Sequence, residues 1–317
     1  MKVISAWLVF VAALVMSACT DKDKAGVTDG RVVTTTGMIA DVARQITGDR
    51  LEVVNIIGEG IDPHSFKPGK SDIDEIQKAG LVFYNGLFLE GKMGTLLESR
   101  SKKGHDTIAV AEGLEGVELI GDGDHPDPHL WMDVSLWTKV ADKIASQLTD
   151  FSPEHAGHFD EQLANYRKDL AEMDQYAREA FATIPENQRV LVTAHDAFSY
   201  LGRAYGIEVR GIQGISTESK AGSKDINDLV NYLVEKKIPA IFVESSVSQK
   251  SVKAVIEGAA QQGHTVINGG TLFSDAMGQP GTYAGTYLGM MDHNITTIVN
   301  ALGGKAPPRG FKNKLAE

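Results

Sequence analysis

The feature that most constrains the fold is a long stretch without glycine or proline in the middle of the chain. Ser152-Pro153-Glu154 is typical of a helix start, because it combines an N-cap residue, a proline in the first turn and an acid. Between Gly157 and about residue 182 the chain contains no further glycine, and it contains no proline between Pro153 and Pro185. Apolar side chains recur there every three or four positions, at Phe159, Leu163, Tyr166, Leu170, Met173 and Ala177. The pattern predicts one helix of about 30 residues, about 45 Å long.

On both sides of this helix, short strands are expected to alternate with helices. Before it, the predicted elements are strands at 31–36, 51–57 and 81–84 and helices at 38–47 and 72–79, the second capped by Ser71. After it, they are strands at 189–193, 208–212, 240–244 and 265–268 and helices at 197–205, 224–236, 251–262 and 283–302. This alternation indicates mostly parallel sheets covered by helices. We therefore expect an α/β protein with two Rossmann-like lobes, 31–150 and 185–317, joined by a long linker helix at 151–184.

The beginning of the chain indicates export. Lys2 precedes an apolar run at 3–16, which is too short to span a bilayer and has the form of a signal-peptide core. Ser17-Ala18-Cys19 follows, and small residues before a cysteine resemble the lipobox of bacterial lipoproteins. We predict a signal peptide at 1–18, lipidation of Cys19 and a polar tether at 19–30. A plain secretory signal is the alternative.

Composition limits the possible partners. The chain carries 31 basic and 42 acidic residues, a net charge of −11, and loss of Lys2 with the signal peptide makes it −12. This acidic balance argues against nucleic acid as a partner. Hydrophobic residues make up 42% of the chain and charged residues 23%, which is ordinary for a globular protein. Cys19 is the single cysteine, so stability depends on the apolar core and not on a disulfide within the chain.

An Asp-Pro-His turn occurs twice, each time followed within two residues by an aromatic side chain. The copies are Asp62-Pro63-His64-Ser65-Phe66 and Asp127-Pro128-His129-Leu130-Trp131. Proline fixes φ and lacks an N–H, so both copies are expected to be turns that present an imidazole in a preset direction. Such a presentation suits a metal site.

Two further candidate ligands follow predicted strands. His195 comes directly after the strand at 189–193, at the expected start of a helix, and Asp275 follows the strand at 265–268 by a short turn. Ligands of open α/β sheets bind beyond the carboxyl ends of the strands. We therefore expect His64, His129, His195 and Asp275 to bind one transition-metal ion in a cleft between the lobes.

Three imidazoles and a carboxylate suit zinc, manganese or iron and suit calcium and magnesium poorly. The rings must be neutral to bind, so affinity is expected to fall below about pH 6.5. Glu244, at the end of the strand 240–244, is a candidate hydrogen-bond acceptor for a ligand imidazole. His155 and His158 are three residues apart on the long helix, and a solvated helix face explains them better than a metal site.

Taken together, the motifs resemble the TroA-like zinc/manganese-binding lipoproteins, the metal-specific solute-binding proteins of ABC transporters. The resemblance covers essentially the whole mature chain and rests on residues 62–66, 127–131, 193–198, 242–246 and 272–278. It implies two α/β lobes joined by a long helix, with metal held between them by His64, His129, His195 and Asp275. It also implies Zn²⁺ or Mn²⁺ as cargo and an integral-membrane permease as partner. The implied location is the periplasm or the outer face of the cytoplasmic membrane, anchored by a lipid on Cys19.

The choice of metal stays open between zinc and manganese. Family members associated with manganese commonly carry glutamate where this chain has His195, and an imidazole favours zinc. Dedicated zinc members often carry a long histidine-rich loop before the second ligand. The corresponding loop here, 122–127, is short and has one histidine.

Two other functions compete with metal capture. A zinc hydrolase would keep a coordination position open for water, with a base such as Asp275 or Glu244. No His-Glu-x-x-His motif occurs, and we expect no enzyme activity. A surface adhesin is the second alternative, because family members are sometimes described in that way. We expect a monomer.

Overall fold

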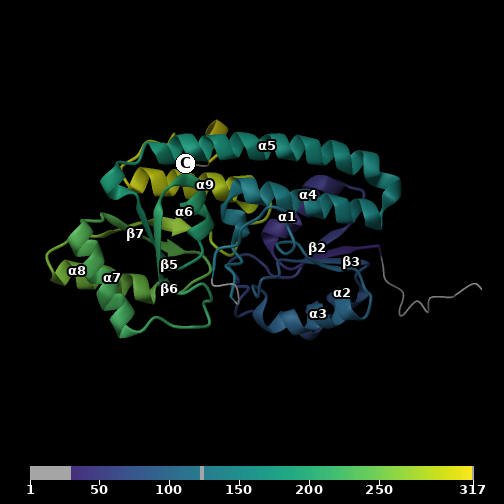
Figure 1. Ribbon diagram of the computed structural model, residues 1–317, viewed down its shortest axis with the longest axis horizontal. Helices are drawn as coiled ribbons and strands as arrows, with labels where there is room; N and C mark the ends of the chain where they lie inside the picture. Colours follow the sequence, from purple (N-terminus) through teal and green to yellow (C-terminus); the bar gives the residue numbers. More distant parts are fainter. Residues whose placement is uncertain (1–29, 122–124, 316–317) are drawn as a thin grey trace, which may run out of the picture.

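The computed structural model describes residues 30–121 and 125–315 (Figure 1). The predicted signal peptide at 1–18 and the predicted lipidation site Cys19 lie outside the described residues. So does the predicted tether at 19–30, apart from Gly30. None of the helices within the described ranges combines the length and apolarity that a membrane span requires.

The N-terminal half is built on one parallel sheet with strand order β2-β1-β3-β4. Its strands are β1 (Val32–Thr34), β2 (Val53–Asn55), β3 (Leu81–Tyr84) and β4 (Thr107–Ala109). Its helices are α1 (Gly37–Thr47), α2 (Lys70–Lys78), α3 (Gly94–Lys102) and α4 (Val134–Phe151). Figure 1 shows α1 and α4 above the sheet and α2 and α3 below it.

The C-terminal half contains two parallel strand pairs. The pairs are β5 (Val190–His195) with β6 (Glu208–Gln213), and β7 (Ala240–Glu244) with β8 (Ile267–Leu272). Strand β5 lies beside β7. The helices are α6 (Ser199–Tyr205), α7 (Ser223–Lys236), α8 (Lys250–Gln261) and α9 (Tyr287–Ala301). In Figure 1, α7 and α8 lie to the left of the strands, whereas α9 lies above them.

The long helix crosses both halves. A 3₁₀ turn at Pro153–His155 leads into α5 (Ala156–Ala182), which has 27 residues. All six side chains of the predicted apolar stripe are buried. α5 packs against α1 and α4 of the N-terminal half and against α9 of the C-terminal half. The predicted fold class, two α/β lobes with mostly parallel sheets and one long helix, is confirmed.

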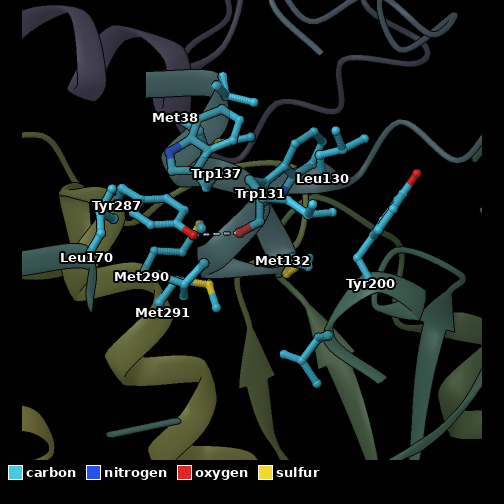
Figure 2. Packing of buried hydrophobic residues seen from close by; sticks show 14 of the residues in the cluster. Met38, Leu130, Trp131, Met132, Trp137, Leu170, Tyr200, Tyr287, Met290 and Met291 are labelled. Carbon is cyan, nitrogen blue, oxygen red and sulfur yellow. Dashed lines mark hydrogen bonds between the residues drawn. The ribbon is translucent and has the colours of Figure 1, made fainter. Parts of the chain in front are cut away.

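One apolar core runs without interruption beneath α5 through both halves. Figure 2 shows its centre, where Met38, Trp137, Leu170 and Tyr287 come together from α1, α4, α5 and α9. On the opposite face of the sheets, each half has its own smaller core. In one half this core lies between the sheet and helices α2 and α3, and in the other it lies between the strands and helices α7 and α8. The two halves therefore share one apolar core on the side of α5 and have separate apolar cores on the other side.

The predicted N-cap of α2 and the predicted bounds of the last strand are wrong. The N-cap of α2 is Gly69 and not Ser71, because the Asp72 carboxylate reaches back and accepts the Gly69 N–H at 2.8 Å. The last strand is Ile267–Leu272 and not 265–268. Glycine in a strand suggests a turn, but at Gly269 an added Cβ would lie 2.6 Å from the Phe242 ring, so this glycine permits close packing inside β8.

Other elements differ from the predictions in extent. The predicted helix at 283–302 is a 3₁₀ turn, Tyr283–Gly285, followed by α9. Thr286 separates them, because its hydroxyl caps α9 by accepting the Gly289 N–H at 3.1 Å. The sequence patterns gave no prediction for α3, β4 or α4.

The continuous core generates a test of α5. Leu170 is fully buried in that core, whereas Lys168 on the same helix is exposed. Leu170→Ala should lower the free energy of unfolding by about 3 kcal/mol, because the alanine leaves a cavity. Lys168→Ala should change it by less than about 0.5 kcal/mol. Urea denaturation of both variants measures the difference, and equal effects would contradict the place of α5 in the core.

Candidate metal centre

The two Asp-Pro-His turns share one hydrogen bond and differ in a second. In each copy the aspartate Oδ1 accepts the backbone N–H of the histidine at 2.9 Å, from His64 to Asp62 and from His129 to Asp127. Asp127 Oδ1 also lies 2.7 Å from Nδ1 of the His129 ring. When Nδ1–H donates this bond, Nε2 keeps its lone pair. The second turn therefore fixes both the backbone and the ring of its histidine.

His195 is the last residue of β5 and not the first of a helix. Its backbone N–H donates to Glu244 Oε1 at 2.8 Å, and its ring Nδ1 contacts Glu244 Oε2. Glu244 ends the neighbouring strand β7, so the predicted hydrogen bond is present. Adjacent strand ends thus orient the imidazole with Nε2 directed away from the carboxylate.

A tryptophan connects the two turns that carry His129 and Asp275. Asp275 comes three residues after β8 ends at Leu272. Trp131 Nε1 donates to the backbone oxygen of Ser274 at 2.9 Å, across the boundary between the halves. The Trp131 backbone oxygen in turn accepts the Tyr287 hydroxyl at 2.8 Å, the dashed line in Figure 2. The Trp131–Ser274 bond holds the His129 turn beside the Asp275 turn, and the Tyr287 bond ties Trp131 to α9.

The four predicted ligands converge on one point. Nε2 of His129 lies 3.4 Å from Nε2 of His64 and 3.3 Å from Oδ1 of Asp275. Asp275 Oδ2 lies 3.2 Å from Nε2 of His195 and 3.9 Å from Nε2 of His64. One ligand atom from each residue can be chosen so that all four lie within 4.8 Å of one another. Donors at 2.0–2.1 Å from a tetrahedral ion are separated by about 3.4 Å, so this donor set fits a single ion.

The convergent atoms are enclosed by protein. His129 and His195 have no exposed surface, Asp275 has 2% and His64 has 3%. Both carboxylate oxygens of Asp275 and Nε2 of His195 are buried without a hydrogen-bond partner among the described residues. Buried polar atoms without partners are costly, and a cation is the group that three imidazole lone pairs and a carboxylate can share.

The carboxylates and rings shift one another's pKa. Burial lowers the pKa of His64 to about 4. Burial also acts to lower the pKa of His129, but Asp127 and Asp275 outweigh it and raise this pKa to about 9. Burial is likewise outweighed at His195, where Glu244 and Asp275 raise the pKa well above its ordinary value. Burial opposes ionisation of Asp275, yet the imidazoles of His195 and His129 hold its pKa well below the usual value.

The metal-free site therefore holds protons where a cation would otherwise supply the positive charge. The pKa of about 9 at His129 favours a protonated ring at neutral pH, the pKa of His195 is shifted in the same direction, and the pKa of about 4 at His64 favours a neutral ring. Competition between protons and metal is then expected to begin near pH 9 at His129, above the range expected from an ordinary imidazole.

The structure brings the four predicted ligands and Glu244 together. His155 and His158, near the start of the long helix, do not belong to this group. His158 contacts the backbone oxygen of Thr47 at 3.2 Å. The sequence reasoning missed two supporting residues, Asp127 for the His129 ring and Trp131 for the Asp275 turn. The repeated Asp-Pro-His turn, with an aromatic residue after it, was the available signal in the sequence. The motif alone does not show that the second copy makes these two hydrogen bonds and the first copy does not.

The pKa shift at His129 gives a test on metal-free protein. Its ring should titrate with a pKa of about 9, and Asp127→Asn should move this pKa toward the ordinary value of about 6.5. Because the folded-state pKa is the higher one, the protonated ring stabilises the fold below about pH 6.5, and this stabilisation is lost as pH rises through about 9. Imidazole NMR over a pH series measures both variants.

Asp62→Asn is the matched control for this titration. The Asp62 carboxylate accepts from the His64 backbone and from the hydroxyls of Ser65 and Thr217, and the structure gives it no bond to the His129 ring. The pKa of His129 should stay near 9 in this variant. A His129 ring that titrates identically in the unmodified protein and in Asp127→Asn would contradict the role of Asp127.

Comparison with known proteins gives closely similar relatives. The chain is 47% identical over 274 residues to the manganese-binding lipoprotein MntA of Bacillus subtilis (strain 168), covering 86% of this chain and 89% of that protein. It is 41% identical over 277 residues to the zinc-binding protein TroA of Treponema pallidum (strain Nichols), covering 86% of this chain and 90% of that protein. The solved structure of periplasmic TroA from Treponema pallidum superimposes with a TM-score of 0.84 over 86% of this chain and 99% of that chain.

The family profile described as ZnuA, "Zinc-uptake complex component A periplasmic", matches residues 32–301. That range contains both halves, the long helix and all four convergent side chains. The resemblance inferred from the motifs is thereby confirmed. This chain belongs to the zinc-uptake complex component A family of periplasmic metal-binding proteins.

Proposed function

We propose that this chain captures a divalent transition metal, zinc or manganese, outside the cytoplasm and delivers it to the permease of an ABC transporter. One observation carries the proposal. Three imidazole nitrogens and one carboxylate, each from a residue at most 3% exposed, converge from four separate segments at the junction of the two halves. We propose His64, His129, His195 and Asp275 as the metal ligands, with Glu244 and Asp127 as the carboxylates that orient two of the rings.

The donor set supports zinc as the tighter ligand and keeps manganese as a possible cargo. Three nitrogens and one or two carboxylate oxygens suit either ion, and zinc lies above manganese in the usual affinity order. MntA is named as a manganese-binding protein and TroA as a zinc-binding protein. Elemental analysis of the protein isolated from its own cell envelope identifies the cargo.

Enclosure of the donors supports capture over hydrolysis. A catalytic zinc ion keeps one position for water, with a base beside it. Here four protein donors surround the point of convergence, and Glu244 is engaged by the backbone and ring of His195. The relatives are named as binding proteins and not as enzymes.

We further propose how the chain is organised for delivery. The signal peptide at 1–18 is removed and Cys19 carries a lipid that holds the protein at the periplasmic or outer face of the cytoplasmic membrane. A tether at 19–30 connects the lipid to a monomer with lobes at 31–150 and 185–317 and a linker helix at 151–184. The lipoprotein names of several relatives support this arrangement.

Substitution of the ligands tests the proposal. Each of four variants lacks one of the four donor side chains and should therefore bind zinc more than about 100-fold more weakly. Loss of a hydrogen-bond partner behind a ligand costs up to about 100-fold, and loss of the ligand itself should cost more. These variants are His64→Ala, His129→Ala, His195→Ala and Asp275→Ala. Competition with a chromophoric chelator measures affinity for Zn²⁺ and Mn²⁺ on the full chain.

His155→Ala is the matched control, because it removes an imidazole from the start of the long helix, away from the four donors. Its zinc affinity should equal that of the unmodified protein. Unchanged affinity in any two of the four ligand variants, with the fold intact by circular dichroism, would overturn the assignment of the site.

A further inference from the structure

The loop that follows β3, residues 85–91, meets both Asp-Pro-His turns; we call it the β3–α3 loop. At its beginning, Asn85 Nδ2 donates to the backbone oxygen of Pro128 at 3.1 Å, one residue before His129. At its end, Gly91 lies against the other turn, so closely that an added Cβ would overlap the backbone oxygen of His64. One short loop is therefore in a position to set the places of two of the four proposed ligands.

Asn85 holds the second turn from the side of the N-terminal sheet. Its side chain has no exposed surface, and Nδ2 also donates to the backbone oxygen of Gly86 at 3.1 Å. The Pro128 oxygen accepts the Leu130 N–H at 2.9 Å in addition to the Asn85 amide. A buried carbonyl that loses a partner is unfavourable, so the Asn85 amide resists displacement of the peptide next to His129.

Glu90 joins the end of this loop to its beginning. The residue is 2% exposed. Its Oε1 accepts the backbone N–H of Asn85 at 2.6 Å and the hydroxyl of Thr35 at 2.8 Å, and its Oε2 accepts the Gly86 N–H at 3.1 Å. Thr35 follows β1 directly, so the carboxylate also ties the loop to the centre of the sheet. Asn85 and Gly91 are thereby held as parts of one unit.

The backbone of the loop is strained between these two ends. Leu87 and Phe88 have φ values of 53° and 65°, in the left-handed region that bulky side chains rarely adopt. Such conformations persist where the surroundings determine them. The Leu87 N–H donates to Glu112 Oε1 at 2.8 Å, and the bonds to Glu90 fix the residues before it. Specific contacts, and not local preference, therefore dictate the shape of the loop.

We propose that Asn85, Glu90 and Gly91 are positioning residues for metal binding. Asn85 acts on the His129 turn through the Pro128 oxygen, Gly91 acts on the His64 turn by close packing, and Glu90 keeps the two contacts in register. The proposal rests on the proposed function. Nε2 of His64 lies 3.4 Å from Nε2 of His129, and ligand side chains must be held within about 0.5 Å of the productive geometry. A shift of either turn would therefore weaken the site.

Removing the Asn85 amide tests the contact with the second turn. Asn85→Ala should bind zinc about tenfold more weakly, because loss of a supporting partner costs about 10- to 100-fold. Competition between the full chain and a chromophoric chelator measures the affinity. Co²⁺ in place of Zn²⁺ gives a second readout, since its visible absorption depends on the geometry of its ligands and should change in this variant.

Leu233→Ala is the control for loss of stability. Leu233 is fully buried in the separate core of the C-terminal half, so its truncation destabilises the fold without altering the β3–α3 loop. The folded protein should keep the zinc affinity and the Co²⁺ spectrum of the unmodified chain.

Adding a methyl group at Gly91 tests the contact with the first turn. Gly91→Ala should displace the His64 backbone and weaken zinc binding by about tenfold. Because φ of Gly91 is 38°, alanine also strains the backbone there. Gly104→Ala is the matched control: φ of Gly104 is 81°, and an added Cβ meets no atom within 4 Å. It carries the strain without the contact and should leave zinc affinity unchanged.

Glu90→Gln tests the unit as a whole. The amide keeps the size of the side chain but replaces one acceptor oxygen by a donor, so the N–H groups of the loop cannot all be accepted. Zinc binding should weaken by about tenfold at about pH 8, where the carboxylate is ionised because burial raises the pKa of Glu90 to about 7. Glu98→Gln, an exposed change on α3 with the same effect on net charge, should bind zinc normally.

A double-mutant cycle shows whether Asn85 acts through His129. In a His129→Ala background, Asn85→Ala should cost less zinc affinity than in the unmodified protein, because the ring that it positions is absent. Equal losses in the two backgrounds would overturn the proposal. Normal affinity and normal Co²⁺ spectra in Asn85→Ala, Gly91→Ala and Glu90→Gln would also overturn it, as would an equal loss in Leu233→Ala. Failure of the unmodified protein to bind zinc would instead contradict the proposed function.

Discussion

The structure depends on holding three imidazoles and a carboxylate together in a place that water does not reach. Such a group is unfavourable unless charges are balanced, because burial of an unpaired charge costs far more than burial of apolar surface. In the metal-free protein, Asp127, Glu244 and Asp275 outweigh burial and raise the pKa of His129 and His195, which favours positive charge on these two rings. A divalent cation can take over the same role, and this exchange is the physical basis of the proposed capture.

The fold brings these side chains together by two means. Parallel strands of both halves end toward the junction, so the segments after them carry candidate ligands from each side. The continuous core under α5 then holds the halves in one arrangement, with Asp41 accepting the Tyr287 N–H at 3.0 Å between α1 and α9. The Trp131–Ser274 hydrogen bond completes this frame next to the site itself.

Much of this architecture is predictable from local patterns. The long helix follows from its apolar period and its lack of breakers, and the four ligands follow from turn chemistry, strand ends and family motifs. Local patterns failed where a distant contact decides. Gly269 belongs to a strand because it packs on Phe242. The partner of Trp131, the backbone oxygen of Ser274, depends on how distant segments of the chain meet, which periodicity does not encode.

The most direct measurement is anomalous X-ray diffraction from crystals of the full chain grown with Zn²⁺, recorded on both sides of the zinc absorption edge. The account predicts one strong peak at the junction of the halves, within about 2.0–2.2 Å of Nε2 of His64, His129 and His195 and of a carboxylate oxygen of Asp275. A principal peak elsewhere, or one that any of these four side chains fails to contact, would contradict it.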